Sequence, residues 1–389
     1  MKTRFVLYLV LIAILSTSCT NGKQSKDSLP CIDVRKNYPE KEIILTDIAD
    51  ITYLHLNSDN DNYLYKGGIR CLTKNTIVVY DESSGNILFF TKGGKPKSYF
   101  NRKGQGPEEY INARIVVYDE VADDVFVLSL GNSEIILVYS ATGEYKRKLV
   151  LPKGTFVNPF VTFDDESLFV YNAMAEAKRR PKGEIDLPVD FCYEPFIRVS
   201  KADGKMLDIV ELPINDIVLR DSPNGPVGLT LRLMKCTEGL LLCNPETDTI
   251  FLYSKNKTLT PVICKTPLVN AMDPMVYMNN CADVGSYQFM AVVTVRREEG
   301  AFPYPIKYYM REKKTGEIFR QKITLPDYTG KEFFFPSNRD YENGHYFELD
   351  LIELKEAYNE NRLSGKLKEL VATLNEEEDN NVFMFVHFK

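Results

Sequence analysis

The residue types that most often carry out acid–base or metal-dependent catalysis are scarce in this chain. Histidine occurs only three times, as His55, His345 and His387. The sequence contains no HExxH or similar paired spacing, which argues against a zinc hydrolase. A GxSxG nucleophile elbow is also missing, although spacing alone leaves a Ser-His-Asp triad open. We expect all three histidines to be structural residues within strands.

Acidic residues are common, but their spacing does not favour a catalytic acid pair. They occur as neighbours at Asp123-Asp124, Asp164-Asp165 and Glu298-Glu299. Glycoside hydrolysis needs two carboxylates at a defined separation, whereas successive residues of a strand point to opposite faces. We therefore expect these pairs to lie in turns. Residues 81–86 lack the ligand alternation of a calcium loop, and we predict no metal ion or other cofactor.

The cysteines do not form a recognisable metal or redox motif. Seven follow Cys19, at irregular spacing and without a CxxC pair. Cys236 and Cys243 flank a predicted hairpin turn, so a disulfide between them is one alternative. The alternative we favour is that the cysteines are buried thiols inside strands, as in the runs ending at Cys243 and Cys264.

Two charged insertions are candidates for recognition loops. The segment 172–194 contains the densest basic cluster, with Lys178, Arg179 and Arg180, and the segment 296–304 contains Arg296, Arg297 and Tyr304. Long loops on rigid scaffolds often carry binding residues. These loops could contact an acidic glycan, a phosphate or a partner protein; the alternative is a solvated charged loop.

The overall charge excludes one class of partner. The formal net charge is −6, and it becomes −8 without Lys2 and Arg4, since 46 basic residues then face 54 acidic ones. Phosphate backbones require a concentrated basic surface. We therefore predict that the chain does not bind nucleic acid.

The scaffold for these loops is indicated by repeated strands. Five times, two short apolar runs joined by a turn are followed by a tight Gly or Asn turn and a longer strand. The tight turns lie at steps of 49, 61, 52 and 60 residues, and they contain Gly94, Gly143, Gly204, Asn256 and Gly316. A four-stranded propeller blade takes about 40 to 50 residues, and the two longer steps contain the insertions.

The two ends of the chain supply a sixth blade. The apolar run 382–388 has no partner after it, and the strands predicted at 42–45 and 51–56 have no repeat before them. Pairing the last strand with the first would close the ring and remove two exposed edges. Apolar residues between 349 and 374 recur with helical spacing. The expected fold is an all-β, six-bladed β-propeller closed by its N- and C-terminal strands, with a short helical insertion near the C-terminus.

The first residues have the features of an export signal. Lys2 and Arg4 precede the apolar stretch 5–15, which is shorter than the roughly 20 residues of a membrane-spanning helix and is typical of a signal peptide. Small residues then lead to Cys19. We predict a lipoprotein signal peptide at 1–18, lipidation of Cys19, a flexible tether at 19–40 and a propeller at 41–389. An ordinary secretory peptide cut near Ser18 is the alternative.

These features together resemble the six-bladed β-propeller lipoproteins of Gram-negative gut anaerobes, which are distantly similar to NHL-repeat and TolB-type propellers. The resemblance rests on Cys19, on the closing strand at the C-terminus and on the segment GQGPEEY. The most specific residues of that segment are Gly104, Gly106, Pro107, Glu108 and Tyr110. We interpret it as a turn between blades in which the two glycines permit unusual φ angles; a ligand contact is the alternative.

The resemblance implies a fold and an envelope location but no catalytic residue. An outer-membrane lipoprotein is therefore expected, held to the membrane by its lipid anchor. The periplasmic face is favoured slightly over the cell surface because no acidic run follows Cys19. We expect a binding or scaffolding module for a protein or glycan partner rather than an enzyme. The alternatives are an envelope glycan hydrolase or lyase with a site in the propeller channel, and a sensor or assembly subunit.

Overall fold

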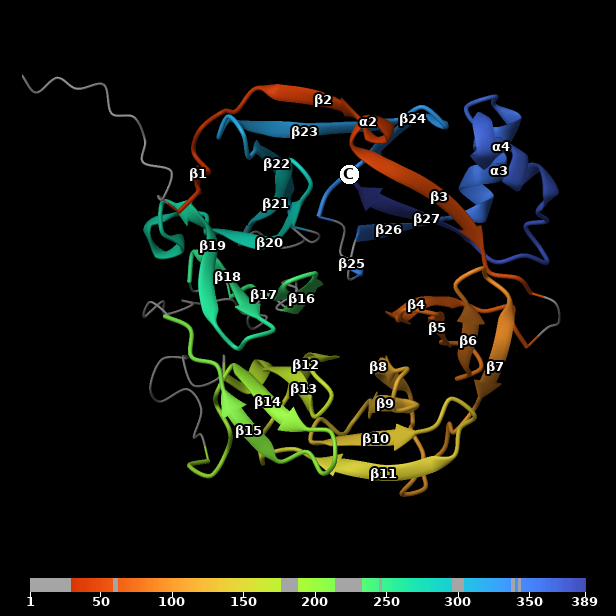
Figure 1. Ribbon diagram of the computed structural model, residues 1–389, viewed down its shortest axis with the longest axis vertical. Helices are drawn as coiled ribbons and strands as arrows, with labels where there is room; N and C mark the ends of the chain where they lie inside the picture. The colour runs from red at the N-terminus through yellow and green to blue at the C-terminus, as the bar shows by residue number, and fades with distance from the viewer. Residues whose placement is uncertain are drawn as a thin grey trace, which may run out of the picture.

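The computed structural model describes residues 29–58, 62–175, 188–213, 233–244, 247–295, 304–336, 340–341 and 344–389. Within these residues the strands form six sheets, which are arranged as a ring (Figure 1). In chain order, the first sheet contains β4 (Gly67–Leu72), β5 (Thr76–Asp81), β6 (Ile87–Thr91) and β7 (Pro96–Phe100). The second sheet contains β8 (Ala113–Asp119), β9 (Asp124–Ser129), β10 (Ile135–Tyr139) and β11 (Tyr145–Val150). The third sheet contains β12 (Val157–Thr162), β13 (Ser167–Asn172), β14 (Phe196–Ser200) and β15 (Met206–Ile209).

The other three sheets each include a strand from the N-terminal part of the chain. The fourth sheet contains β16 (Leu233–Cys236), β17 (Gly239–Leu242), β18 (Thr249–Ser254), β19 (Leu259–Thr266) and β1 (Cys31–Asp33). The fifth sheet contains β20 (Val276–Val284), β21 (Tyr287–Thr294), β22 (Ile306–Glu312), β23 (Ile318–Leu325), β24 (Tyr328–Phe333) and β2 (Glu40–Ile44). The sixth sheet contains β25 (Asp340–Tyr341), β26 (Gly344–Leu349), β27 (Val382–Phe388) and β3 (Ala49–His55). A short 3-10 turn, η2 (Val269–Ala271), precedes β20.

The apolar core lies between neighbouring sheets rather than at a single centre. Every residue of β5 is buried, because both faces of that strand are covered. One core cluster joins β5 and β6 to β8, β9 and β10, and includes Phe89, Tyr110 and Tyr139. This packing explains why the second strand of each repeat is apolar at nearly every position instead of alternating. The expectation of an all-β propeller is confirmed.

The N-terminal strap, which we define as residues 31–55, runs along three sheets in succession. Strand β1 pairs in parallel with β19, and β2 pairs in parallel with β23. The short helix α2 (Leu45–Ile48) leads to β3, which is antiparallel to β27 from Ala49↔Phe388 to His55↔Val382. Figure 1 shows β3 and β27 side by side at the edge of the ring.

The strap corrects two expectations. Residues 31–33 and Glu40 belong to strands, so the assignment of all of 19–40 to a flexible tether was wrong for them. Cys31 lies directly opposite Cys264 in register and forms a disulfide with it, at a Cα–Cα distance of 4.4 Å. Cys264 is therefore not a free thiol, and Cys236 and Cys243 do not form a disulfide with each other. Residues 1–28, including Cys19, lie outside the described residues.

Two short helices lie in the connection between β26 and β27. They are α3 (Leu351–Asn359) and α4 (Gly365–Thr373). Asp350 caps α3 by accepting a hydrogen bond from the backbone N–H of Glu353 at 3.0 Å. Leu354, Leu367 and Val371 are fully buried against the strands around them. None of the helices in the described residues is both long enough and apolar enough to cross a membrane.

The order of the strands places several connections on one face of the ring. Within an antiparallel sheet, the connection after the second strand and the connection after the fourth strand leave on the same side. The long connections 173–195, 295–305 and 350–381 all follow a second strand. The end of β26 and the start of β22 therefore reach the same face, and this positions the cleft described below.

Candidate ligand-binding cleft

The segment GQGPEEY connects β7 to β8, which belong to different sheets, as the sequence indicated. Tyr110 is fully buried. Its hydroxyl donates a hydrogen bond to the carbonyl of Gly85 at 2.8 Å and accepts one from the backbone N–H of Arg102 at 3.1 Å. The hydroxyl of Tyr139 donates to the carbonyl of Glu108 at 2.8 Å. These bonds tie the first sheet to the second, so the segment is a structural connection.

The two glycines of this segment do not act as expected. Neither Gly104 nor Gly106 has a positive φ angle, so the interpretation that they permit unusual φ was wrong. They leave room instead for the side chain of Glu109, whose Oε2 atom would lie 1.9 Å from a Cβ at position 104. That oxygen accepts a hydrogen bond from the backbone N–H of Gly106 at 2.9 Å. Pro107 lies within the resulting turn.

The predicted recognition loops are only partly described. Lys178, Arg179, Arg180, Arg296 and Arg297 lie outside the described residues. Tyr304 is described, and it packs half-buried against a small cluster that contains Tyr277, Val293 and Val295. It takes no part in the cleft described next.

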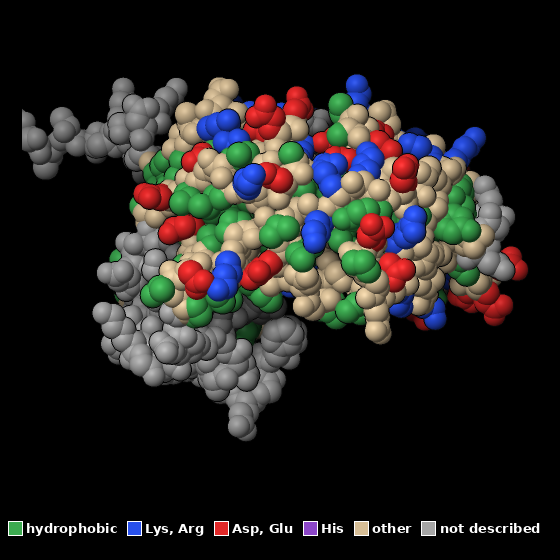
Figure 2. Space-filling view, turned by 90° about the horizontal axis from the view of Figure 1, so that it is seen from below, with side chains coloured by type: hydrophobic (Ala, Val, Ile, Leu, Met, Phe, Trp, Pro, Cys, Tyr) green, Lys and Arg blue, Asp and Glu red, His purple; other side chains and the backbone are tan. Residues whose placement is uncertain are grey.

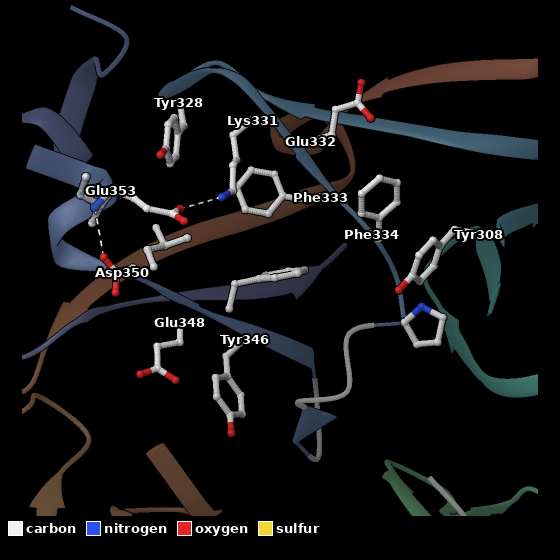
Figure 3. A pocket seen from close by; sticks show the side chains of 14 residues that line it. Tyr308, Tyr328, Lys331, Glu332, Phe333, Phe334, Tyr346, Glu348, Asp350 and Glu353 are labelled. Carbon is white, nitrogen blue, oxygen red and sulfur yellow. Dashed lines mark hydrogen bonds and ion pairs between the residues drawn. The ribbon is translucent and has the colours of Figure 1, made fainter. Parts of the chain in front are cut away.

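A cleft with a volume of about 470 Å³ lies between β24, β26 and the start of α3. Figure 3 shows aromatic side chains from β22, β24 and β26 around it, with carboxylates at its edges. The residues that line it are Tyr308, Tyr328, Lys331, Glu332, Phe333, Phe334, Pro336, Tyr346, Phe347, Glu348, Leu349, Asp350, Glu353 and Leu354. Strand β25 pairs with β26 at Asp340–His345 and Tyr341–Gly344, and the following residues of β26, from Tyr346 to Leu349, line the cleft.

An aromatic stack forms the exposed apolar surface of the cleft. The rings of Tyr308 and Phe334 are 4.7 Å apart between centroids and inclined by only 27°. Phe334 is 38 % exposed, while Tyr328, Phe333 and Tyr346 are almost fully buried. Burial also raises the pKa of Tyr308. The stack therefore offers a flat ring to a ligand, and the buried rings behind it hold the wall in place.

The buried side chain of Gln321 fixes the position of the stack. Its Nε2 atom donates to the carbonyls of Tyr309 at 2.7 Å and Phe335 at 2.5 Å. Its Oε1 atom accepts from the backbone N–H of Phe335 at 3.0 Å. One amide thus links the residue after Tyr308 to the residue after Phe334. Because Gln321 is only 6 % exposed, water competes little for these bonds.

The charged side chains of the cleft differ in how far they are already engaged. Lys331 forms an ion pair with Glu353 at 2.9 Å, and Asp350 caps α3. Glu348 accepts a hydrogen bond from Asn381 at 3.0 Å, and Glu332 is exposed at the end of β24. Figure 3 shows Glu332 above Phe333 and Phe334, with its carboxylate turned away from both rings, and Glu348 beside Tyr346. Both carboxylates line the cleft, at separate places.

A second cavity, of about 380 Å³, lies between β16, β20 and β26. Two of its charged groups are engaged with protein: Lys235 donates to Thr162 at 2.8 Å, and Asp283 accepts from Gln288 at 2.8 Å. His345, on its wall, is buried, and burial lowers its pKa to about 4. Across the described residues, no three His, Cys, Asp or Glu side chains are grouped closely enough to hold a metal ion.

The outer surface shows no strong separation of charge on the side seen in Figure 2, where Lys and Arg side chains alternate with Asp and Glu. Elsewhere among the described residues, exposed charges form ion pairs, such as Arg70–Glu82 and Lys322–Glu42. Exposed pairs of this kind contribute little to stability. The cleft is therefore the better candidate for recognition than this surface.

Sequence reasoning missed the residues of the cleft. Tyr308 was part of a predicted strand, and the run Glu332–Phe335 carried no functional assignment. The available signal was three consecutive phenylalanines before Pro336. Alternation along a strand buries every second residue, so a triple run of this kind places at least one ring outside the core.

Comparisons with known proteins agree with this architecture. Residues 20–185 match a family described as a 6-bladed beta-propeller. A crystal structure of a protein from Bacteroides fragilis NCTC 9343, described as exported, has a TM-score of 0.61 at 17 % identity, covering 93 % of this chain and 100 % of that one. A protein of unknown function from Bacteroides thetaiotaomicron VPI-5482 has a TM-score of 0.40 at 8 % identity, covering 87 % of this chain and 76 % of that one.

No curated protein matches the sequence. At 17 % identity the Bacteroides fragilis structure establishes the fold alone, and it does so over nearly the whole chain. The family match covers the strands from β1 to β13 and includes the segment GQGPEEY. This chain is a β-propeller that, over residues 20–185, matches a family of six-bladed β-propellers.

Proposed function

We propose that the protein is a binding module of the cell envelope that recognises a glycan through the cleft between β24, β26 and α3. In this proposal each of the six sheets is one blade, and the pairing of β3 with β27 closes the ring. Cys19 is lipidated and anchors the protein to the outer membrane, slightly favoured at its periplasmic face. The chain acts by binding rather than by catalysis.

The observation that carries this proposal is the stack of Tyr308 and Phe334 in a cleft that carboxylates also line. The C–H bonds on one side of a sugar ring form a flat apolar surface, which packs against an aromatic ring. The hydroxyl groups at the edge of a sugar donate hydrogen bonds to carboxylate oxygens. Glu332 and Glu348 line the same cleft as Phe334, so one bound glycan could use both kinds of contact.

The size and position of the cleft are compatible with a glycan chain. A volume of about 470 Å³ lies within the range of ligand sites, roughly 300 to 1,000 Å³. The cleft opens at the ring face where the long connections 295–305 and 350–381 leave their strands. A chain of sugars could therefore extend from the cleft across this face.

The test is a binding screen of the full chain against oligosaccharides, followed by calorimetry on Phe334→Ala. This substitution removes the exposed ring, and we expect the affinity to fall about tenfold, since loss of roughly 50 Å² of apolar contact corresponds to that factor. Phe156→Ala is the matched control, because Phe156 is 41 % exposed and lies outside the cleft. Equal losses in both variants, or a folded protein that binds no oligosaccharide, would refute the proposal.

A further inference from the structure

The charges that line the cleft are unbalanced. One lysine, Lys331, faces four carboxylates, at Glu332, Glu348, Asp350 and Glu353, so the formal charge of the lining is 1 − 4 = −3. Lys331 is neutralised by its ion pair with Glu353. Among the residues that the structure describes, neither an arginine nor a histidine lines the cleft. A ligand that enters it therefore meets a negative potential.

The aromatic surface of the cleft also favours a positively charged ligand. An aromatic ring carries a negative face, which attracts a cation placed over it. The exposed ring of Phe334 and the carboxylates that line the cleft thus favour the same kind of group, a positive charge on a flat apolar ligand. Uronic acids, sulfated sugars and phosphorylated sugars carry the opposite charge and are disfavoured.

Resting on the proposed function, we propose that the cleft selects glycans built from amino sugars with free, protonated amines. The pyranose ring stacks on Phe334, and the ammonium group lies beside Glu348 or Glu332. The carboxylates are close to solvent, where water weakens the attraction between opposite charges without abolishing it. We therefore expect the amine to bind about tenfold more tightly than a neutral sugar.

The experiment compares two ligands with the same sugar backbone: a glucosamine tetramer, which carries protonated amines, and its fully N-acetylated counterpart, which is neutral. Calorimetry on the full chain at low salt is expected to give about tenfold tighter binding of the amine. An oligomer of galacturonic acid is expected to bind more weakly than either. Raising the salt concentration to about 0.5 M shortens the screening length and should reduce the preference to less than threefold.

The decisive variant is the double substitution Glu332→Gln and Glu348→Gln. It should abolish the preference for the amine, because each Gln keeps an oxygen that accepts a hydrogen bond from a sugar hydroxyl but loses the charge that attracts the ammonium group. The control is Glu376→Gln with Glu377→Gln, which changes the net charge by the same amount in an exposed turn away from the cleft. If the control variant loses the preference equally, the effect is due to overall charge and the inference fails.

The remaining outcomes separate this inference from the proposed function. Equal affinity for the two tetramers, with binding still dependent on Phe334, would refute the charge selection and leave a neutral glycan as the ligand. Tighter binding of the galacturonic acid oligomer would refute it as well. Binding of neither tetramer nor any neutral oligosaccharide would refute the proposed function itself.

Discussion

At the residue scale, burial explains the roles of the polar groups better than catalysis does. Tyr110 was a candidate ligand contact, yet both of its hydroxyl hydrogen bonds are to backbone atoms inside the protein. His345 is 2 % exposed and lies against the rings of Phe335 and Phe388. Such groups stabilise a fold in which each sheet has to pack against its neighbours.

His345 predicts a specific pH dependence of stability. Burial lowers its pKa to about 4, whereas the unfolded chain has a histidine pKa of about 6.5. The unfolded state therefore binds more protons between these values, and stability falls as the pH falls through this window. The contribution of His345 between pH 7.5 and pH 5 is about 2 kcal/mol. Urea unfolding of His345→Leu at both pH values should show a pH dependence smaller by that amount; an unchanged dependence would contradict it.

At the element scale, the tight turns were the part of the fold most readable from sequence. Gly94, Gly143, Gly204 and Gly316 all have φ angles near +80°, the left-handed conformation that favours glycine. In the fourth repeat the sequence indicated Asn256, but the residue with positive φ is Lys257, at 62°. The repeat was recognisable because one turn geometry recurs. The residue that adopts the positive φ angle in a given turn could not be predicted, because the neighbouring strands set the register.

The inter-sheet connection at Tyr110 gives the second prediction. Tyr110→Phe removes the hydroxyl and leaves the carbonyl of Gly85 and the N–H of Arg102 without this partner. Loss of a buried hydrogen bond of this kind costs about 1 to 3 kcal/mol, so urea unfolding should show a decrease in that range. Glycan affinity should stay the same. A loss of affinity without a loss of stability would instead place Tyr110 in a binding site.

The cleft could not be predicted for a related reason. It is built by β24, β26 and α3, and Phe334 is positioned by Gln321 from β23. Local patterns indicate each of these elements but not their arrangement. The spacing of apolar residues at 349–374 indicated helices, and α3 and α4 do lie there. Nothing in that spacing places Glu353 beside Lys331.

At the scale of the whole molecule, the N-terminal strap holds the ring together over long sequence distances. Cys31 and Cys264 are 233 residues apart in the chain, and β3 pairs with β27 across an even longer separation. The end-to-end pairing could be expected from unpaired strands at both termini. The parallel pairing of β1 with β19 could not, because a strand of three residues carries too little pattern.

The disulfide gives the third prediction. A bond that closes a long loop restricts the unfolded chain and typically contributes about 2 to 5 kcal/mol. Cys31→Ser should lower the free energy of unfolding by an amount in this range, measured with urea under non-reducing conditions. Adding a reducing agent should destabilise the original protein to the same level and leave the variant unchanged. Equal stability of the two proteins without reductant would contradict a stabilising role.

The same strap determines how the protein responds to mechanical tension. A force that pulls on the chain ahead of residue 31 reaches Cys31 first and passes through its sulfur atoms into β19. Residues after Cys31 then carry little of the load. The hydrogen bonds between β3 and β27 lie beyond this point in the chain, so they carry little of the applied force. Drag on a tethered propeller would therefore strain one outer strand while the ring stays closed.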